Sequence, residues 1–470
     1  MKEKHTPKMM NNTKDIVLSV LPLLLYYTFS LFDANYNAWQ QGLCLAKHAM
    51  NRRKKKRIKW STVGERISDK QFRRMFRMTR KCFAELCTNI ATSVGETEFK
   101  SESYIDPFLA NKDNMFMAHE KTSGGYISGE TKLGLTLRLL AGGDALDLGV
   151  MFDIHPRTCT QIMVDVLMKW IIKPKIGGIS MYDYLDDQEA MQKVSDGFSK
   201  RSNGVFKGGI GALDGWLVRI IRPGWRRDGY RNITAFFSRK GFYALNVQVI
   251  VDDKKRVLWL SYSHKGGSHD SSCFRSTRLY DHLRKIAAQL LEKGFFIIGD
   301  SAYCIESFLI PPFDNACPRT PDDDFNFFHS SARITVECAF GEIDMRWGIF
   351  WKRLNCSLEN AAIIIEGAMR LHNYLVDYRE NNLGEKELED DMVLFQQDLL
   401  NSNTIPVQTG NDLGRPRGNI TSEDRLNRVD GTRLRANLSQ KIQDYDMHRP
   451  RKNEWYSDSS TYTKRIPEGE

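Results

Sequence analysis

The sequence lacks the cysteine patterns of zinc proteins and of secreted disulfide frameworks. Its nine cysteines include no CxxC pair and no Cys/His cluster with the spacing of zinc ligands. Cys87, Cys159 and Cys338 stand in apolar runs, where cysteine behaves as a small core residue. We therefore expect reduced thiols in a cytosolic or nuclear protein, with these three side chains in the core.

A full-length membrane span is also lacking, although the apolar stretch at 16–32 raises the alternatives of a signal anchor or a short span. Residues 16–32 are apolar, but they contain Pro22 and carry no small-residue cleavage pattern. The stretch is short for a membrane span, so a buried helix or a start of the reading frame assigned too far upstream are the alternatives. We expect that it does not insert into a membrane.

The chain has fewer acidic than basic residues, so its formal net charge is +10. A basic chain favours a polyanionic partner. Part of the excess lies at 52–57, RRKKKR, within a leader that spans 1–60. Such a block is typical of a nuclear localisation signal or a phosphate-contacting arm, and a solvated charge run is the alternative. Residues 381–470 have almost no apolar periodicity, and we expect a largely disordered tail.

Residues 61–200 are expected to form a helical DNA-binding region. Helical periodicity runs through 67–92 and again through 131–175. The second block places the turn Asp153-Ile154-His155-Pro156 between a short helix and a longer one, which is the layout of a helix-turn-helix. A three-helix packing unit without DNA contact is the alternative. The candidate DNA contacts open the longer helix and are Arg157, Thr158, Thr160 and Gln161.

Residues 205–380 change to a pattern of strands. The strand-like runs are 209–213, 243–251, 257–263 and 295–299. A hairpin signal, Asp252-Asp253-Lys254-Lys255, joins the second and third, and a helix at about 272–292 precedes the fourth. This order predicts an α/β fold, a ribonuclease H-like mixed sheet flanked by helices and preceded by the helical region.

Three acidic residues stand out against this pattern. Asp214 and Asp300 each end an apolar strand-like run, and Glu337 lies inside a helical segment. A carboxylate at the end of a buried strand is costly unless something pairs with it. Three converging carboxylates most naturally hold Mg²⁺ or Mn²⁺, and two such ions about 4 Å apart suit phosphodiester chemistry.

A series of short motifs accompanies these acids. They are Ala212-Leu213-Asp214-Gly215; Asn246-Val247-Gln248 followed by Asp252; Gly266-Gly267-Ser268-His269-Asp270-Ser271; Gly299-Asp300-Ser301-Ala302-Tyr303; Asn326, His329, Ser330, Arg333, Glu337 and Phe340-Gly341; and Arg370-Leu371-His372-Asn373. Their order resembles the PIF/Harbinger transposases and their domesticated nuclease relatives, which are DDE endonucleases. The resemblance covers about 67–380 and is strongest over 209–375.

The resemblance implies a catalytic, metal-binding triad of Asp214, Asp300 and Glu337. Asp270 competes for the second position, but it follows a glycine-rich turn, so we expect it to cap the next helix. His269 and Asp270 are candidates to line the site. Arg333, one turn before Glu337, is expected to hold a phosphate, orient the carboxylate or form a simple ion pair.

One position departs from related transposases, which often carry a basic residue two helical turns after the catalytic Glu. Here that position is Asp344, which cannot contact a DNA phosphate, and Arg346 is the candidate replacement. The resemblance nevertheless implies a metal-dependent DNA endonuclease that acts at terminal inverted repeats in the nucleus. It implies a Myb-like partner protein and leaves a homo-oligomer open. The rival interpretations are a domesticated, catalytically silent DNA-binding or scaffold protein and an enzyme acting on RNA or hybrid duplexes.

Overall fold

The computed structural model describes residues 58–100, 127–224, 229, 232–382, 422–450 and 466. The apolar stretch at 16–32 and the basic block at 52–57 lie outside these residues. Within the described ranges, no helix is both long enough and apolar enough to cross a membrane.

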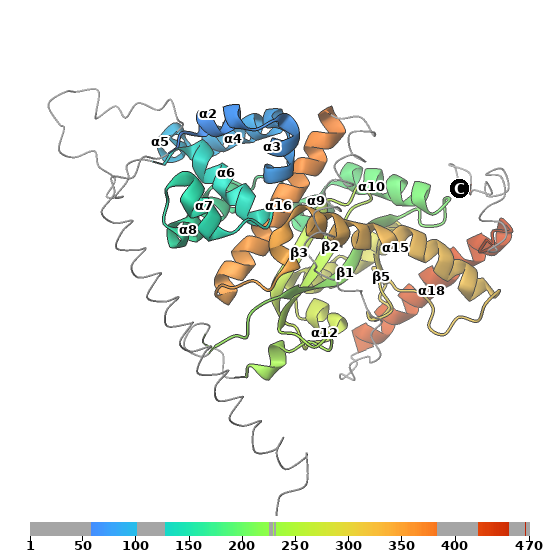
Figure 1. Ribbon diagram of the computed structural model, residues 1–470. Coiled ribbons are helices and arrows are strands. Elements are labelled where there is room, and N and C mark those ends of the chain that lie inside the picture. The colour runs from blue at the N-terminus through green and yellow to red at the C-terminus, as the bar shows by residue number, and fades with distance from the viewer. Residues whose placement is uncertain are drawn as a thin grey trace, which may run out of the picture. The chain divides into compact units, whose positions relative to one another are not determined.

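A mixed sheet organises the described part of 205–380 (Figure 1). Its strands are β1 (Gly209–Arg219), β2 (Ala244–Val251), β3 (Val257–Lys265), β4 (Phe296–Gly299) and β5 (Leu309–Ile310), in the order β3-β2-β1-β4-β5. The β1–β2 and β2–β3 pairs are antiparallel, whereas β1–β4 and β4–β5 are parallel. This order and these directions are consistent with a ribonuclease H-like core, and the predicted α/β mixed sheet is confirmed.

Helices precede the sheet and flank it. Before it come α2 (Trp60–Arg66), α3 (Asp69–Phe76), α4 (Arg80–Val94), α5 (Glu96–Phe99), α6 (Gly129–Leu140), α7 (Ala145–Phe152), α8 (Pro156–Val166), η1 (Leu167–Ile172), α9 (Met181–Asp186) and α10 (Gln188–Arg201). After β1 come η2 (Thr234–Phe236), α12 (Asp270–Arg275), α13 (Arg278–Lys285), α14 (Ala287–Glu292), α15 (Pro321–Arg346), η3 (Gly348–Trp351), α16 (Leu358–Asn382) and α18 (Ser422–Asp444). The single crossover helix expected at 272–292 is therefore three short helices.

The turn between α7 and α8 lies at the residues expected from the sequence, and a DNA-binding helix-turn-helix stays a prediction. Asp144 caps α7 by accepting the backbone N–H of Leu146 at 2.7 Å. His155 caps α8, and its Nδ1 accepts the backbone N–H of Arg157 at 3.2 Å. The helical region does not form a separate core, because its buried residues and those of the sheet belong to one hydrophobic cluster.

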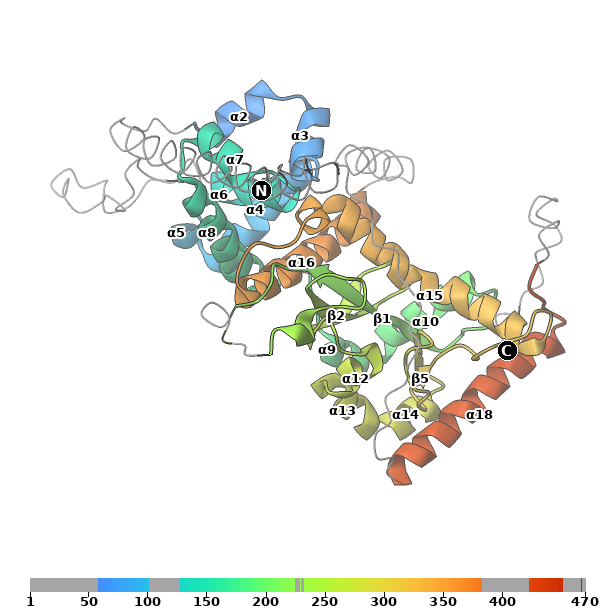
Figure 2. The ribbon, with the colours of Figure 1, turned by 60° about the horizontal axis from the view of Figure 1, so that its bottom comes forward.

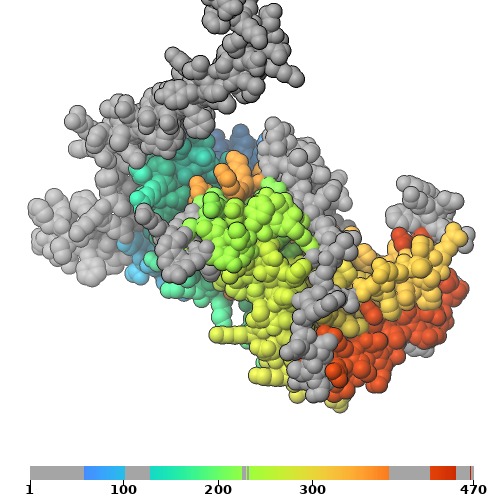
Figure 3. All heavy atoms as spheres, turned by 90° about the horizontal axis from the view of Figure 1, so that it is seen from below, coloured from blue at the N-terminus to red at the C-terminus, as the bar shows by residue number. Residues whose placement is uncertain are grey.

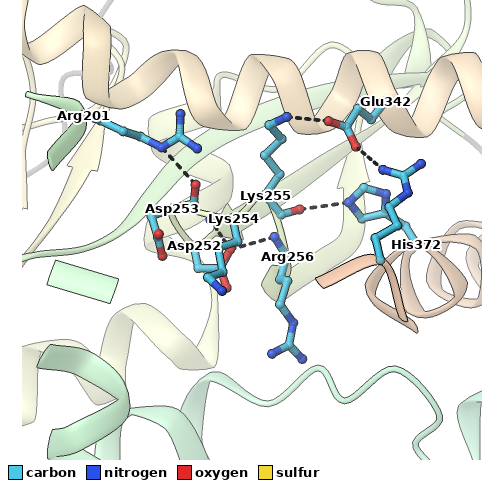
Figure 4. Close-up of polar contacts among 9 residues, drawn as sticks. Arg201, Asp252, Asp253, Lys254, Lys255, Arg256, Glu342 and His372 are labelled. Carbon is cyan, nitrogen blue, oxygen red and sulfur yellow. Dashed lines mark hydrogen bonds and ion pairs between the residues drawn. The ribbon is translucent and has the colours of Figure 1, made fainter. Parts of the chain in front are cut away.

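The β2–β3 hairpin turns at the predicted residues and is fastened to two helices (Figure 4). The Asp252 carboxylate accepts the backbone N–H groups of Lys254 and Arg256 at 2.9 and 2.7 Å. The Lys255 ammonium lies 2.5 Å from the Glu342 carboxylate of α15, and the Lys255 carbonyl accepts a bond from His372 of α16. These contacts fix the helix that carries Glu337 against the sheet.

Part of the expected disordered tail is an ordered helix. Helix α18 lies beside α15 and β5, as both ribbon views show (Figures 1 and 2), and its atoms adjoin those of α15 in the space-filling view (Figure 3). The buried Asp424 carboxylate pairs with Arg275 and Arg284, at 3.4 and 3.3 Å. Arg435 donates to the Pro311 and Pro312 carbonyls. The prediction of disorder was wrong for Ser422–Asp444, because tertiary ion pairs hold a helix of low apolar content.

Candidate active site

Asp214 and Asp300 meet across two neighbouring parallel strands. Leu213 of β1 pairs in register with Gly299, the last residue of β4, and each of the two is followed by an aspartate. The prediction that Asp214 ends its strand was wrong, since β1 continues to Arg219. Each carboxylate accepts the backbone N–H of the following residue at 2.7 Å, Gly215 for Asp214 and Ser301 for Asp300.

Helix α15 brings Glu337 to the same place. Phe340, one turn after Glu337, stacks on Trp216 of β1 with ring centroids 5.8 Å apart. Nearer the start of the helix, the buried His329 bonds the Ile310 carbonyl at 3.0 Å, and Asn326 bonds both the N–H and the carbonyl of Phe313. The motif residues Asn326 and His329 therefore position the helix.

Arg333 lies between two of the three acids. Its guanidinium is 2.5 Å from the Glu337 carboxylate and 3.4 Å from that of Asp214. The i,i+4 ion pair expected within the helix is present, and a second pair across to β1 adds to it. Arg333 thus partly neutralises a cleft that gathers negative charge.

Asp270 supplies a fourth carboxylate to the cleft. It is the first residue of α12, whose N-cap is His269, so the predicted capping role was wrong. Its Oδ1 accepts the side-chain N–H groups of Asn246 at 2.7 Å and Gln248 at 2.9 Å. Both amides are buried, and Gln248 in turn accepts the hydroxyl of buried Tyr303 at 2.7 Å. Three of the sequence motifs therefore meet in one hydrogen-bond network that fixes Asp270.

Gly215 makes the close approach of Asp270 feasible. A Cβ at this position would lie 2.2 Å from Asp270 Oδ1 and 2.8 Å from Gln248 Nε2. A side chain at 215 would displace the Asp270 carboxylate and the Gln248 amide from their present positions. Gly215, which follows Asp214, thus leaves the room that the Asp270 carboxylate occupies.

These acids line one surface cleft. Asp214, Asp270, Asp300 and Glu337 share it with Arg333 and with the predicted site-lining residue His269. Arg239 and Lys240, which the sequence reasoning missed, line it as well. A basic pair followed by Gly241, just before a strand, was the signal available for them.

The cleft perturbs the ionisation of Asp214. Burial raises the pKa of Asp214 to about 7, Arg333 opposes that shift, and the neighbouring Asp300 and Asp270 add to it. Positive charge in the cleft favours the ionised form of this carboxylate, as Arg333 already does. The site is therefore suited to a cationic ligand.

One prediction about the end of α15 needs correction. Arg346 is 1% exposed, so it cannot contact DNA at the surface. Asp344 does not line the cleft, and burial raises its pKa to about 7 against the opposing charge of Arg219. Of the three cysteines expected in the core, Cys87 and Cys159 are buried, but Cys338 is exposed on α15.

The candidate DNA contacts lie where solvent reaches them. Arg157, Thr160 and Gln161 are exposed at the start of α8, and Thr158 is half-buried. Their contact with DNA stays a prediction.

Comparison with known proteins relates the chain to DDE endonucleases. Residues 213–373 match the DDE superfamily endonuclease family. The chain is 22% identical to "Protein ALP1-like" of Arabidopsis thaliana, over 73% of this chain and 79% of that protein. It is 26% identical to "Putative nuclease HARBI1" of Rattus norvegicus and of Mus musculus, over 41% of this chain and 52% of each relative. The match thus spans about half the length of the rodent relatives. No solved structure gives a significant match.

Fold, acidic cleft and matched domain together define a nuclease- or transposase-like protein of the DDE class. Within that class, the matched domain and these relatives support a Harbinger-type DDE endonuclease family for this chain.

DDE superfamily endonucleases generally use divalent metals. In the described part of the chain, no group of three His, Cys, Asp or Glu side chains is arranged to hold an ion. The donor chemistry nevertheless fits, because four carboxylates line one cleft and hard divalent ions prefer oxygen ligands. The Arg333 guanidinium already places a positive charge between two of them. Asp214, Asp300 and Glu337 are the residues that would hold the metal.

Proposed function

We propose that this protein is a metal-dependent DNA endonuclease that hydrolyses phosphodiester bonds at the ends of a transposable element and joins the freed strands to a target. The observation that carries the proposal is the convergence of Asp214, Asp300 and Glu337 on one cleft. The family match supports a nucleic-acid substrate, and the net charge of +10 suits a polyanion.

Bound Mg²⁺ or Mn²⁺, two ions in our proposal, would supply an activated water or 3′-hydroxyl and stabilise the leaving oxygen. Asp214, Asp300 and Glu337 would hold the ions and keep them in place. Arg333 would leave its two carboxylates when they bind metal, and its guanidinium would then be available for a phosphate oxygen. Asp270, held by two amides, would keep its carboxylate directed at the same cleft.

A Myb-like protein, acting with the exposed start of α8, would direct the nuclease to terminal inverted repeats in the nucleus. These elements of the proposal come from the family resemblance and from the charge of the chain. A homo-oligomer that pairs two transposon ends is compatible with them.

The proposal is tested by cleavage of a labelled duplex that carries the terminal repeat, with Mg²⁺ or Mn²⁺, comparing the intact chain with Asp300→Ala. We expect the variant to lose cleavage by roughly a hundredfold or more while it still binds DNA, since even outer-shell partners of metal ligands cost about 10- to 100-fold in activity when mutated. Equal cleavage by both proteins contradicts the role of Asp300. DNA binding without cleavage by either favours the domesticated scaffold, the second candidate function.

A further inference from the structure

The turn Ser238–Gly241 holds two cations at the wall of the acidic cleft. The Ser238 N–H bonds the Phe242 carbonyl at 2.8 Å, and the Gly241 N–H returns to the Ser238 carbonyl at 3.0 Å. Gly241 has a φ of +83°, a conformation that side chains rarely adopt. Arg239 and Lys240 therefore occupy the tip of a tight turn, with Arg239 exposed and Lys240 half-buried.

The segment leading into this turn is seated on the glycine pair of the Gly266-Gly267-Ser268-His269-Asp270 motif. The Gly267 N–H bonds the Ala235 carbonyl at 2.9 Å. A Cβ on Gly267 would lie 2.8 Å from that carbonyl and 3.0 Å from the Phe237 carbonyl, and one on Gly266 would lie 2.9 Å from the Phe236 carbonyl. The glycines thus allow two backbones to approach closely, and the same motif continues into Asp270. The loop that contains Gly266 and Gly267 therefore positions both the Ser238–Gly241 turn and Asp270.

The tip of the turn and the acids share one cleft. Arg239 and Lys240 line it together with Asp214, Asp270 and Glu337. Burial and the charge of Arg239 lower the pKa of Lys240, and the charges of Asp214 and Asp270 oppose that shift, which agrees with a position facing both.

We propose that Arg239 and Lys240 form the phosphate-gripping wall of the cleft and bind the backbone of the DNA strand beside the scissile bond. This rests on the proposed function and names the side chains that would offset the repulsion between four carboxylates and a phosphodiester. It also accounts for the loss of a basic position in α15: Asp344 lies off the cleft and Arg346 is buried, while the turn supplies two cations to the cleft wall.

The test measures binding of a duplex oligonucleotide to the full chain in EDTA, where no cleavage occurs, over a series of salt concentrations. Each phosphate contact contributes roughly 0.9 to the slope of log K against log salt. We expect the double variant Arg239→Gln/Lys240→Gln to have a slope smaller by about 2 in magnitude. Arg239→Lys/Lys240→Arg keeps the charges and should keep the slope. Lys285→Gln, an exposed cation on α13 away from the cleft, is the matched control and should leave the slope unchanged.

The outcomes separate the two proposals. A wild-type slope in the glutamine double variant overturns the gripping wall, whether or not the protein cleaves DNA. If the two cations only balanced the acids, the thermal midpoint of that variant would fall while its slope stayed the same. Absence of salt-dependent duplex binding by the wild-type chain would overturn both proposals.

Discussion

Removal of the Glu342 side chain should weaken the attachment of α15, the helix that carries Glu337, to the β2–β3 hairpin and to α16. The Glu342 side chain is 9% exposed and accepts from Lys255 at 2.5 Å and from Arg379 at 3.4 Å. Breaking a buried ion pair by deleting one partner costs about 3–5 kcal/mol, because the remaining charge is buried and unpaired. Lys255 is 31% exposed and can recover part of its hydration, whereas Arg379 is only 10% exposed. We therefore expect Glu342→Ala to lower the free energy of unfolding by about 3 kcal/mol, the lower end of that range.

The loss should depend on pH with a defined sign. Burial alone would raise the pKa of Glu342, but the hydrogen bond and charge of Lys255, with His372 and Arg379, bring it below its ordinary value. A group whose pKa is lower in the folded state stabilises the fold above its unfolded pKa, roughly 4.3 for glutamate, and loses that effect as the pH falls through the folded value. The difference between wild type and variant should be complete at about pH 7 and shrink below about pH 4.

The assay is urea unfolding followed by tryptophan fluorescence. The control is Glu292→Ala, an exposed residue at the end of α14, which should stay within about 0.5 kcal/mol of wild type. A decrease of less than about 1 kcal/mol in the free energy of unfolding for Glu342→Ala at pH 7 would refute the reasoning. The positive charges of Lys255 and Arg379 would then be compensated without Glu342.

Three further variants probe the cleft. Asp270→Asn keeps an acceptor for the two buried amides, so the melting temperature should hold while cleavage falls at least tenfold, about 1.4 kcal/mol of transition-state stabilisation. Arg333→Gln removes the internal cation, and calorimetry should show a lower melting temperature without metal and a larger rise on adding Mn²⁺; an unchanged rise would contradict the bridging role. Gly267→Ala should weaken DNA binding as the glutamine double variant does, since its Cβ meets backbone that cannot yield, and binding at wild-type strength would exclude that coupling.

The sequence was sufficient to predict the mixed sheet and to single out acids that the structure brings to one cleft. The strand runs have strong apolar patterns, and motifs that follow them carry the acids, so local signals coincide with the fold. The extent of β1 beyond Asp214 was not predicted, because Asp214 and Gly215 interrupt the apolar run. The reason for Gly215 is tertiary: Asp270 of another element needs the space that a side chain would fill.

The errors share a physical origin. Asp270 follows a glycine-rich turn in the manner of a cap, but its carboxylate bonds two amides on β2, a strand distant in the sequence. A charged residue such as Arg346 is usually found at the surface, yet Arg346 is 1% exposed because it lies on the buried face of α15 with Glu342 and Ile343. Side-chain direction depends on neighbours from elsewhere in the fold, which one-dimensional periodicity does not report.

Helix α18 also covers the sheet edge that β5 forms. Strand β5 is outermost in the sheet order, and an uncovered edge offers unpaired backbone groups to a second molecule. Leu438 and Ile442 of α18 are buried, and Arg435 stacks on Phe313, just after β5, at 4.0 Å. A chain ended at Asn382 would keep every acid of the cleft and lose this cover. Self-association through β5, rather than loss of catalytic groups, is the expected consequence of such a truncation.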